Sequence, residues 1–146
     1  MHVSRAEIAF ARGDAENARR LAGQVLQELS NSPARDYLKW LEARALLVQG
    51  WSSLNLGHPS DALPSLQRAV ELRESTVDAT SVILALARIA LANCYLDLGQ
   101  RDKAKTLSEA AANAVAAHHA VGNQYLKPLK DLQTRIRHAS SSPQAD

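Results

Sequence analysis

Cysteine occurs once in this chain, at Cys94, so no internal disulfide can form. Aromatic residues make up only 4% of the 146 residues, and glycine occurs six times. No apolar run approaches the roughly 20 residues needed to span a bilayer, and the N-terminus lacks the apolar segment of a signal peptide. The formal net charge of +2 is too small to indicate nucleic acid or an acidic membrane surface as partner. We therefore expect a cytoplasmic protein with no nucleic-acid or membrane partner.

The sequence also lacks the short motifs that carry catalysis. It contains no Gly-rich phosphate loop, no HExxH and no GxSxG. His118 and His119 are adjacent, so on a helix their side chains point about 100° apart and cannot share one metal ion by helical spacing. Cys94 has no histidine three or four residues away, which favours a buried structural thiol over a nucleophile. We predict that the chain is not an enzyme and holds neither a cofactor nor a metal.

The dominant pattern in the chain is a repeat that occurs three times. In each copy a small residue is followed seven positions later by a glycine, and five positions after that by an alanine. The three glycines are Gly13, Gly57 and Gly99, which lie 44 and 42 residues apart. Glycine adopts the left-handed conformation that ends many helices, and this period lies in the range of helical-hairpin repeats. The pattern therefore predicts helical hairpins that turn at these glycines.

Apolar residues at helical spacing extend on both sides of each turn. They predict seven helices, at about residues 3–12, 15–29, 33–56, 59–74, 79–98, 101–119 and 125–138. Asp14 is the expected N-cap of the second helix, and Pro64 predicts a kink or a later start in the fourth. We predict an all-α fold, an α-solenoid of about three stacked antiparallel hairpins plus a C-terminal capping helix.

We expect one domain over residues 1–139. Its three hairpin units cover about residues 1–32, 33–77 and 78–122, and its cap covers residues 123–139. Residues 140–146, which are rich in serine, are predicted to form a disordered tail.

Residues 50–69 and 92–111 resemble the tetratricopeptide repeat. In that family a small residue, an aromatic residue three positions later, a turn glycine and two later alanines follow one another in this order. Ala92, Tyr95 and Gly99 match the start of this order in the third unit, whereas Ser53 replaces the aromatic residue in the second. The period exceeds the usual 34 residues and is similar to that of long-period variants found in bacterial signalling proteins and regulators.

The resemblance implies a superhelix in which the first helix of each hairpin lines a concave groove. The residues that it places on this face, and that we predict to contact a partner, are Arg44, Trp51, Asn55, Asn93 and Asp97. Trp51 offers a large apolar surface with one N–H donor, which is typical of a binding hot spot. The alternative interpretation is that Trp51 packs beneath the N-terminal hairpin.

The resemblance also implies a function without catalysis. We expect a protein–protein interaction module that binds a peptide or partner domain in this groove, as the C-terminal regulatory part of a larger bacterial signalling protein. Two alternatives remain open. One is a small-ligand sensing domain of a transcriptional regulator, and the other is a self-association module that forms a homodimer.

Overall fold

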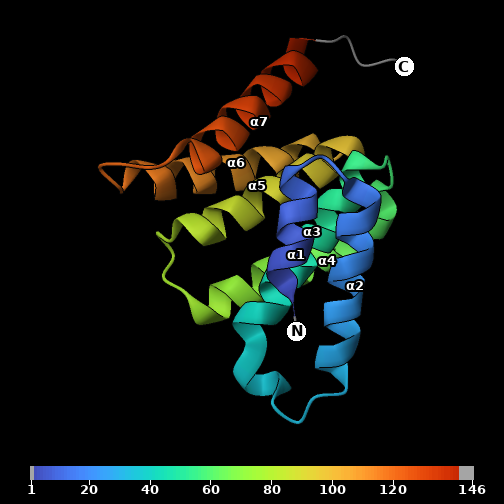
Figure 1. The fold of residues 1–146 in the computed structure, drawn as a ribbon. Helices are drawn as coiled ribbons and strands as arrows, with labels where there is room; N and C mark the ends of the chain where they lie inside the picture. The colour runs from blue at the N-terminus through green and yellow to red at the C-terminus, as the bar shows by residue number, and fades with distance from the viewer. Residues whose placement is uncertain (1, 142–146) are drawn as a thin grey trace. The chain divides into compact units, whose positions relative to one another are not determined.

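The computed structural model describes residues 2–141 and is built from helices (Figure 1). The elements are α1 (Val3–Ala11), α2 (Ala15–Ser30), a short 3-10 helix η1 (Arg35–Leu38), α3 (Lys39–Asn55), α4 (Pro59–Thr76), α5 (Val82–Asp97), α6 (Arg101–Ala116) and α7 (Asn123–Ser141). Within the described residues there are seven α-helices and no strand. The prediction of an all-α fold with seven helices is confirmed.

The three repeated glycines end α1, α3 and α5 in the same way. Gly13, Gly57 and Gly99 have φ angles of 81°, 80° and 76°. Each glycine N–H donates to the carbonyl three residues before it, at 2.9–3.0 Å. The next N–H donates to the carbonyl five residues before it, as in Asp14 to Ala9 at 3.0 Å. These are the two bonds of a Schellman motif, which requires a left-handed residue at the glycine position.

The contacts of the chain divide it into two compact units, which meet in sequence between Val77 and Asp78. This division coincides with the predicted end of the second hairpin. The prediction of one domain over residues 1–139 stays a prediction. Of the predicted tail, residues 140 and 141 belong to α7, and residues 142–146 lie outside the described part of the chain.

In the first unit, α1 and α2 form a hairpin, and α3 packs against both of them as well as against α4. One core cluster joins the three helices through Val3, Val25, Leu29, Leu41 and Ala45. Between α3 and α4 the backbones approach closely at Gly50, where an added Cβ would lie 2.5 Å from the Leu66 side chain. The small residue of the second repeat is therefore required by packing.

In the second unit, α5 and α6 form a hairpin, and α7 packs against both. Buried residues occur on several sides of α5, among them Leu84, Ile89 and Cys94. In contrast, α7 buries Leu129 and Leu132 on one side. The position of α7 after the hairpin agrees with a helix that covers its end.

The start of the third helix was predicted wrongly. The chain does not become α-helical at Pro33 but forms η1 first, and α3 begins at Lys39. The Ser32 hydroxyl accepts a hydrogen bond from the Ala34 N–H at 3.2 Å, and the Tyr37 N–H reaches back only three residues. This local bonding of a serine side chain competes with the α-helical ladder.

Two further boundaries differ for similar reasons. Helix α5 begins at Val82 and not at residue 79. The Asp78 carboxylate accepts hydrogen bonds from both the N–H and the hydroxyl of Thr80, each at 3.0 Å, and these bonds hold the residues just before the helix in a turn. Helix α6 ends at Ala116, and the next two N–H groups bond to carbonyls three residues back.

The remaining helix predictions agree more closely with the structure. Helix α4 starts at Pro59 and contains Pro64, so the later start is wrong. The Asp14 side chain caps α2 by accepting a bond from the Asn17 N–H at 3.3 Å, as predicted. Among the described residues, no helix has the length and hydropathy required of a membrane span.

Candidate functional site

One face of α3 carries both tryptophans of the chain. Its residues recur every three or four positions, a spacing that places side chains on one side of a helix. We call this face the α3 stripe; its residues are Trp40, Arg44, Leu47, Trp51 and Asn55. Trp40 is 48% exposed, Asn55 is also exposed, and the other three are half-buried. The α3 stripe therefore contains three predicted contact residues, Arg44, Trp51 and Asn55.

Trp51 is in contact with the preceding hairpin but is not fully enclosed. Its ring lies 5.7 Å from that of Phe10 on α1, centroid to centroid, at an interplanar angle of 50°. Tilted aromatic pairs at this distance are favourable beyond the area they bury. The contact accounts for part of the Trp51 side chain, and the residue keeps intermediate exposure.

Arg44 joins α3 to α1 through a two-pronged ion pair with Glu7. Its Nε donates to one carboxylate oxygen at 2.8 Å and its Nη2 to the other at 2.5 Å. The hydrogen bond to Glu7 raises the pKa of Arg44 above its usual value, although partial burial opposes the shift. The guanidinium carbon also lies 5.8 Å from the centre of the Trp40 ring, within the range of a cation–π interaction. Arg44 is therefore held in place beside an exposed tryptophan.

A second arginine, Arg73 of α4, is buried near this pair and is only 7% exposed. Burial lowers the pKa of Arg73, the charge of Arg44 lowers it further, and the charge of Glu7 opposes both effects. Glu7 is thus the carboxylate that acts on two cations. Sequence reasoning did not identify Glu7 or Arg73 as members of one cluster.

Comparison with known proteins adds no family assignment. No family model, curated protein or solved structure matches the chain.

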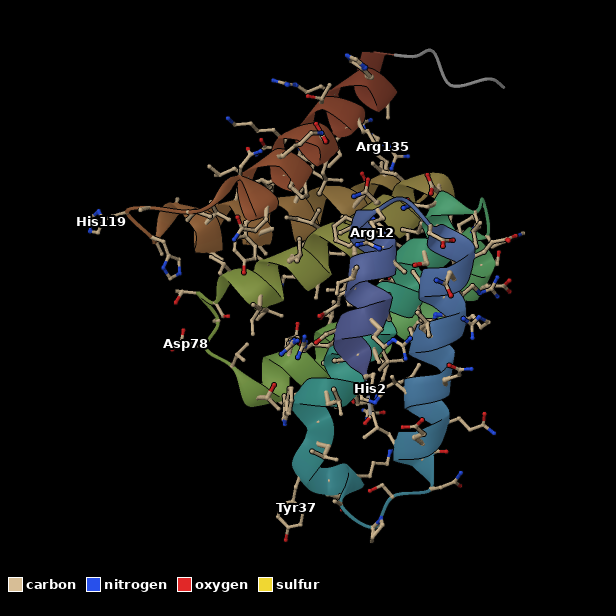
Figure 2. All side chains as sticks on the ribbon, in the orientation of Figure 1. His2, Arg12, Tyr37, Asp78, His119 and Arg135 are labelled. Carbon is tan, nitrogen blue, oxygen red and sulfur yellow. The ribbon has the colours of Figure 1, made fainter. Side chains whose placement is uncertain are left out.

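In the second unit the two predicted contact residues of α5 are held by α7. Arg135 donates to the Asn93 Oδ1 atom and to the Asp97 Oδ1 atom, both at 2.6 Å. Figure 2 shows the Arg135 side chain at the edge of α7. The Asn93 Nδ2 group in turn donates to the Ile89 carbonyl at 3.0 Å. Asn93 and Asp97 therefore form a binding site for one guanidinium group, that of Arg135 on α7.

The structure brings the predicted residues together in two groups. Arg44, Trp51 and Asn55 share a face of the first unit, and Asn93 and Asp97 share Arg135 in the second. Trp40, which lies on the same face as the first group, and Tyr37, an exposed residue just before it in the sequence, were missed. Trp40 could have been found by continuing the spacing of four residues back from Arg44. Tyr37, at 86% exposure, lies on η1 and points away from the ribbon in Figure 2.

Cys94 and Glu42 are two further buried titratable groups. In the part of the chain that the structure describes, no group of three or more histidine, cysteine, aspartate or glutamate side chains could hold a metal ion. Burial raises the pKa of the Cys94 thiol to about 11, and the charge of Asp97 adds to this effect. The thiol is thus protonated at neutral pH. Glu42 is buried, with its carboxylate 3.0 Å from Arg35 and 4.0 Å from Arg68.

Proposed function

We propose that the chain is a non-catalytic interaction module that binds a peptide or a partner helix along the α3 stripe. The observation that carries this proposal is the placement of both tryptophans on one helix face, with Trp40 48% exposed beside the held Arg44. Tyr37, three residues before Trp40 on η1, is a further exposed aromatic side chain. Tryptophan, tyrosine and arginine are the residues most enriched at binding hot spots.

The surroundings of the α3 stripe favour a protein ligand over a small molecule. The stripe runs from Trp40 to Asn55, sixteen residues of helix, whose ends lie roughly 22 Å apart at the usual rise. A peptide strand or an amphipathic helix can follow a face of that length and place a side chain at each turn. Arg44 is already fixed by Glu7, so a partner that stacks on Trp40 loses little side-chain freedom at this point.

The second unit supplies a separate hypothesis about the partner. Asn93 and Asp97 bind the guanidinium of Arg135, so a partner that reaches them must offer a cation in its place. The broader assignment, a regulatory part of a bacterial signalling protein, rests on the resemblance to long-period tetratricopeptide repeats.

The proposal can be tested with the intrinsic fluorescence of the chain. Because the only two tryptophans both lie on the α3 stripe, tryptophan emission reports directly on this face. We expect peptides selected from a random display library on the intact chain to shift this emission on titration. Trp40→Ala combined with Tyr37→Ala should weaken their binding at least tenfold, or about 1.4 kcal/mol, without changing the helical circular dichroism.

Lys130→Ala is the control, because Lys130 is exposed and lies on α7, outside the α3 stripe. It should leave the selected peptides bound with unchanged affinity. Selected peptides that shift the tryptophan emission of the original chain, yet bind equally well to the Trp40/Tyr37 double variant, would contradict the proposal.

A further inference from the structure

The α1 surface contains an exposed isoleucine at a repeat position whose side chain is buried in the other two repeats. Counting two residues beyond the repeated small residue gives Ile8, Ser52 and Cys94. Ser52 and Cys94 are both 0% exposed, whereas Ile8 is 50% exposed. The most apolar of the three side chains is therefore the one in contact with water.

The second repeat shows what normally lies over this face. Val48, one turn before Ser52, packs in a cluster with alanines of α1 and α2, which are Ala6, Ala9, Ala18 and Ala22. The hairpin α1–α2 thus covers the Val48 side of α3. The residue equivalent to Val48 in the first repeat is Ser4, which is exposed like Ile8. By the pattern of the repeat, this α1 face is built to receive a helix.

The border of this face is positively charged. An open hollow of about 370 Å³ lies between α1 and α2, and its lining includes Ile8, Leu21, Arg5, Arg12, Arg20 and Asp14. The three arginines are exposed. The one carboxylate, that of Asp14, is already used to cap α2 through the Asn17 N–H. We call this surface the arginine face.

We propose that the arginine face binds an amphipathic helix with acidic flanks, supplied by a partner protein. Apolar side chains of the partner helix would cover Ile8 and Leu21, and its carboxylates would pair with Arg5, Arg12 and Arg20. Arg5 and Arg12 are seven residues apart, about 10 Å along α1, so carboxylates two turns apart on the partner match them. A guanidinium binds a carboxylate with two parallel hydrogen bonds, which a neutral acceptor with a single oxygen cannot accept in this way.

A second copy of the chain is a poor occupant. Pairing two arginine faces would oppose three arginines with three arginines, and like charges brought together across an interface are costly. The open surface of α6 and α7 is also unsuitable, because the hollow there is lined by Lys105 and Arg137, with Glu109 as its one acid. Charge complementarity therefore selects an acidic partner.

The test uses the full chain and two synthetic helical peptides that differ only in their flanks. Both peptides carry leucines on one face of the helix. At two positions that flank this face, i and i+7, one peptide has glutamates and the other has lysines. Binding is followed by fluorescence anisotropy of a dye on the peptide. We expect the glutamate peptide to bind at least tenfold more tightly than the lysine peptide. Its affinity should fall as the salt concentration rises from 50 mM to 200 mM.

Four variants locate the binding site. Arg5→Glu combined with Arg12→Glu should weaken the binding of the glutamate peptide at least tenfold and strengthen the binding of the lysine peptide. Ile8→Ser should weaken both peptides several-fold. Lys130→Glu, an exposed charge reversal on α7, should change the affinity of neither, and Trp40→Ala should also have no effect, which separates this surface from the α3 stripe. Circular dichroism of each variant checks that it remains folded.

Three outcomes would overturn the proposal. The first is no binding of the glutamate peptide at about 1 mM, and the second is equal binding of the two peptides. The third is a concentration-dependent dimer in analytical ultracentrifugation that Ile8→Ser abolishes, which would make a second copy the occupant.

Discussion

The third helix of each unit packs against the two helices before it, but α3 and α7 are held by different forces. Helix α3 is buried over most of its length, from Leu41 to Ser53. In α7, the fully buried side chains within the described residues are Leu129 and Leu132. Both helices nevertheless send an arginine back to the first helix of their unit, Arg44 to Glu7 and Arg135 to Asn93 and Asp97.

This difference in burial between α3 and α7 determines how much each arginine contributes to the stability of its helix. Burying an apolar side chain contributes about 1.5–3 kcal/mol, so the many buried residues of α3 outweigh one partly exposed ion pair. For α7, with two fully buried leucines, two charge-assisted bonds are a larger share of the total. We expect α3 to be positioned mainly by packing, and α7 to depend on Arg135.

The largest effect should come from the close approach that packing demands in the first unit. Gly50→Ala places a Cβ 2.5 Å from the Leu66 Cγ atom, so the side chain or the helix must shift. Overpacking of this kind lowers the free energy of unfolding by about 1–3 kcal/mol, and the better helix propensity of alanine offsets about 1 kcal/mol of this loss. We expect a net loss of stability, measured as a lower midpoint in urea unfolding.

The equivalent position in the second unit is Ala92, which is 0% exposed. Ala92→Gly is the reverse exchange, yet it should also destabilise, by about 1 kcal/mol, through lost helix propensity. In a Leu66→Ala background the side chain that opposes the new Cβ is shortened, and Gly50→Ala should become neutral or stabilising. If Gly50→Ala is as harmful with Leu66 removed, close packing is not its cause.

The next effect tests the two arginines directly. Arg135→Ala should raise the amide hydrogen-exchange rates of α7 about tenfold, which corresponds to about 1.4 kcal/mol, while α5 and α6 change little. Arg44→Ala should change the exchange of α3 less, because packing holds that helix and Arg73 still acts on the Glu7 charge. The matched control is Arg137→Ala, since Arg137 also lies on α7 and donates to the hydroxyl of Thr134, three residues earlier on the same helix. Equal effects of the three substitutions on their helices would remove the distinction between α3 and α7.

The local features of the fold could be predicted from the sequence, because their causes are local. A glycine that ends a helix and an aspartate that caps the next one act within five residues, so Gly13 and Asp14 were placed correctly. The start of α3 was missed because the bond from Ala34 to the Ser32 hydroxyl competes with a helical pattern that looks continuous. Helical spacing carries no information on such side-chain competition.

The site could be predicted only in part, for a related reason. Spacing along one helix is enough to group Arg44, Trp51 and Asn55. It cannot show that Arg44 meets Glu7 or that Arg135 meets Asn93, because these pairs are 37 and 42 residues apart and depend on how separate helices pack.

The effect that is smallest at neutral pH, where it vanishes, appears only at high pH and belongs to the second unit alone. The folded chain raises the pKa of Cys94 to about 11, because the thiol is buried and Asp97 is near, whereas the unfolded thiol has the usual value near 9. Between these values the unfolded chain loses a proton that the folded chain keeps. Stability should therefore fall as pH rises above about 9, by up to roughly 1.4 kcal/mol per pH unit, and should not depend on this group at neutral pH.

Cys94→Ala removes the thiol and isolates its contribution from the lysines and tyrosines that titrate in the same range. We expect the difference in unfolding free energy between the original chain and this variant to be constant from pH 6 to 8 and to shrink above pH 9. The first unit has no cysteine, so the loss should appear as faster amide exchange in α5 and α6 and not in α1 to α3. A constant difference up to pH 11 would mean that water reaches the thiol, and that α5 is packed less tightly than its equivalent in the first unit.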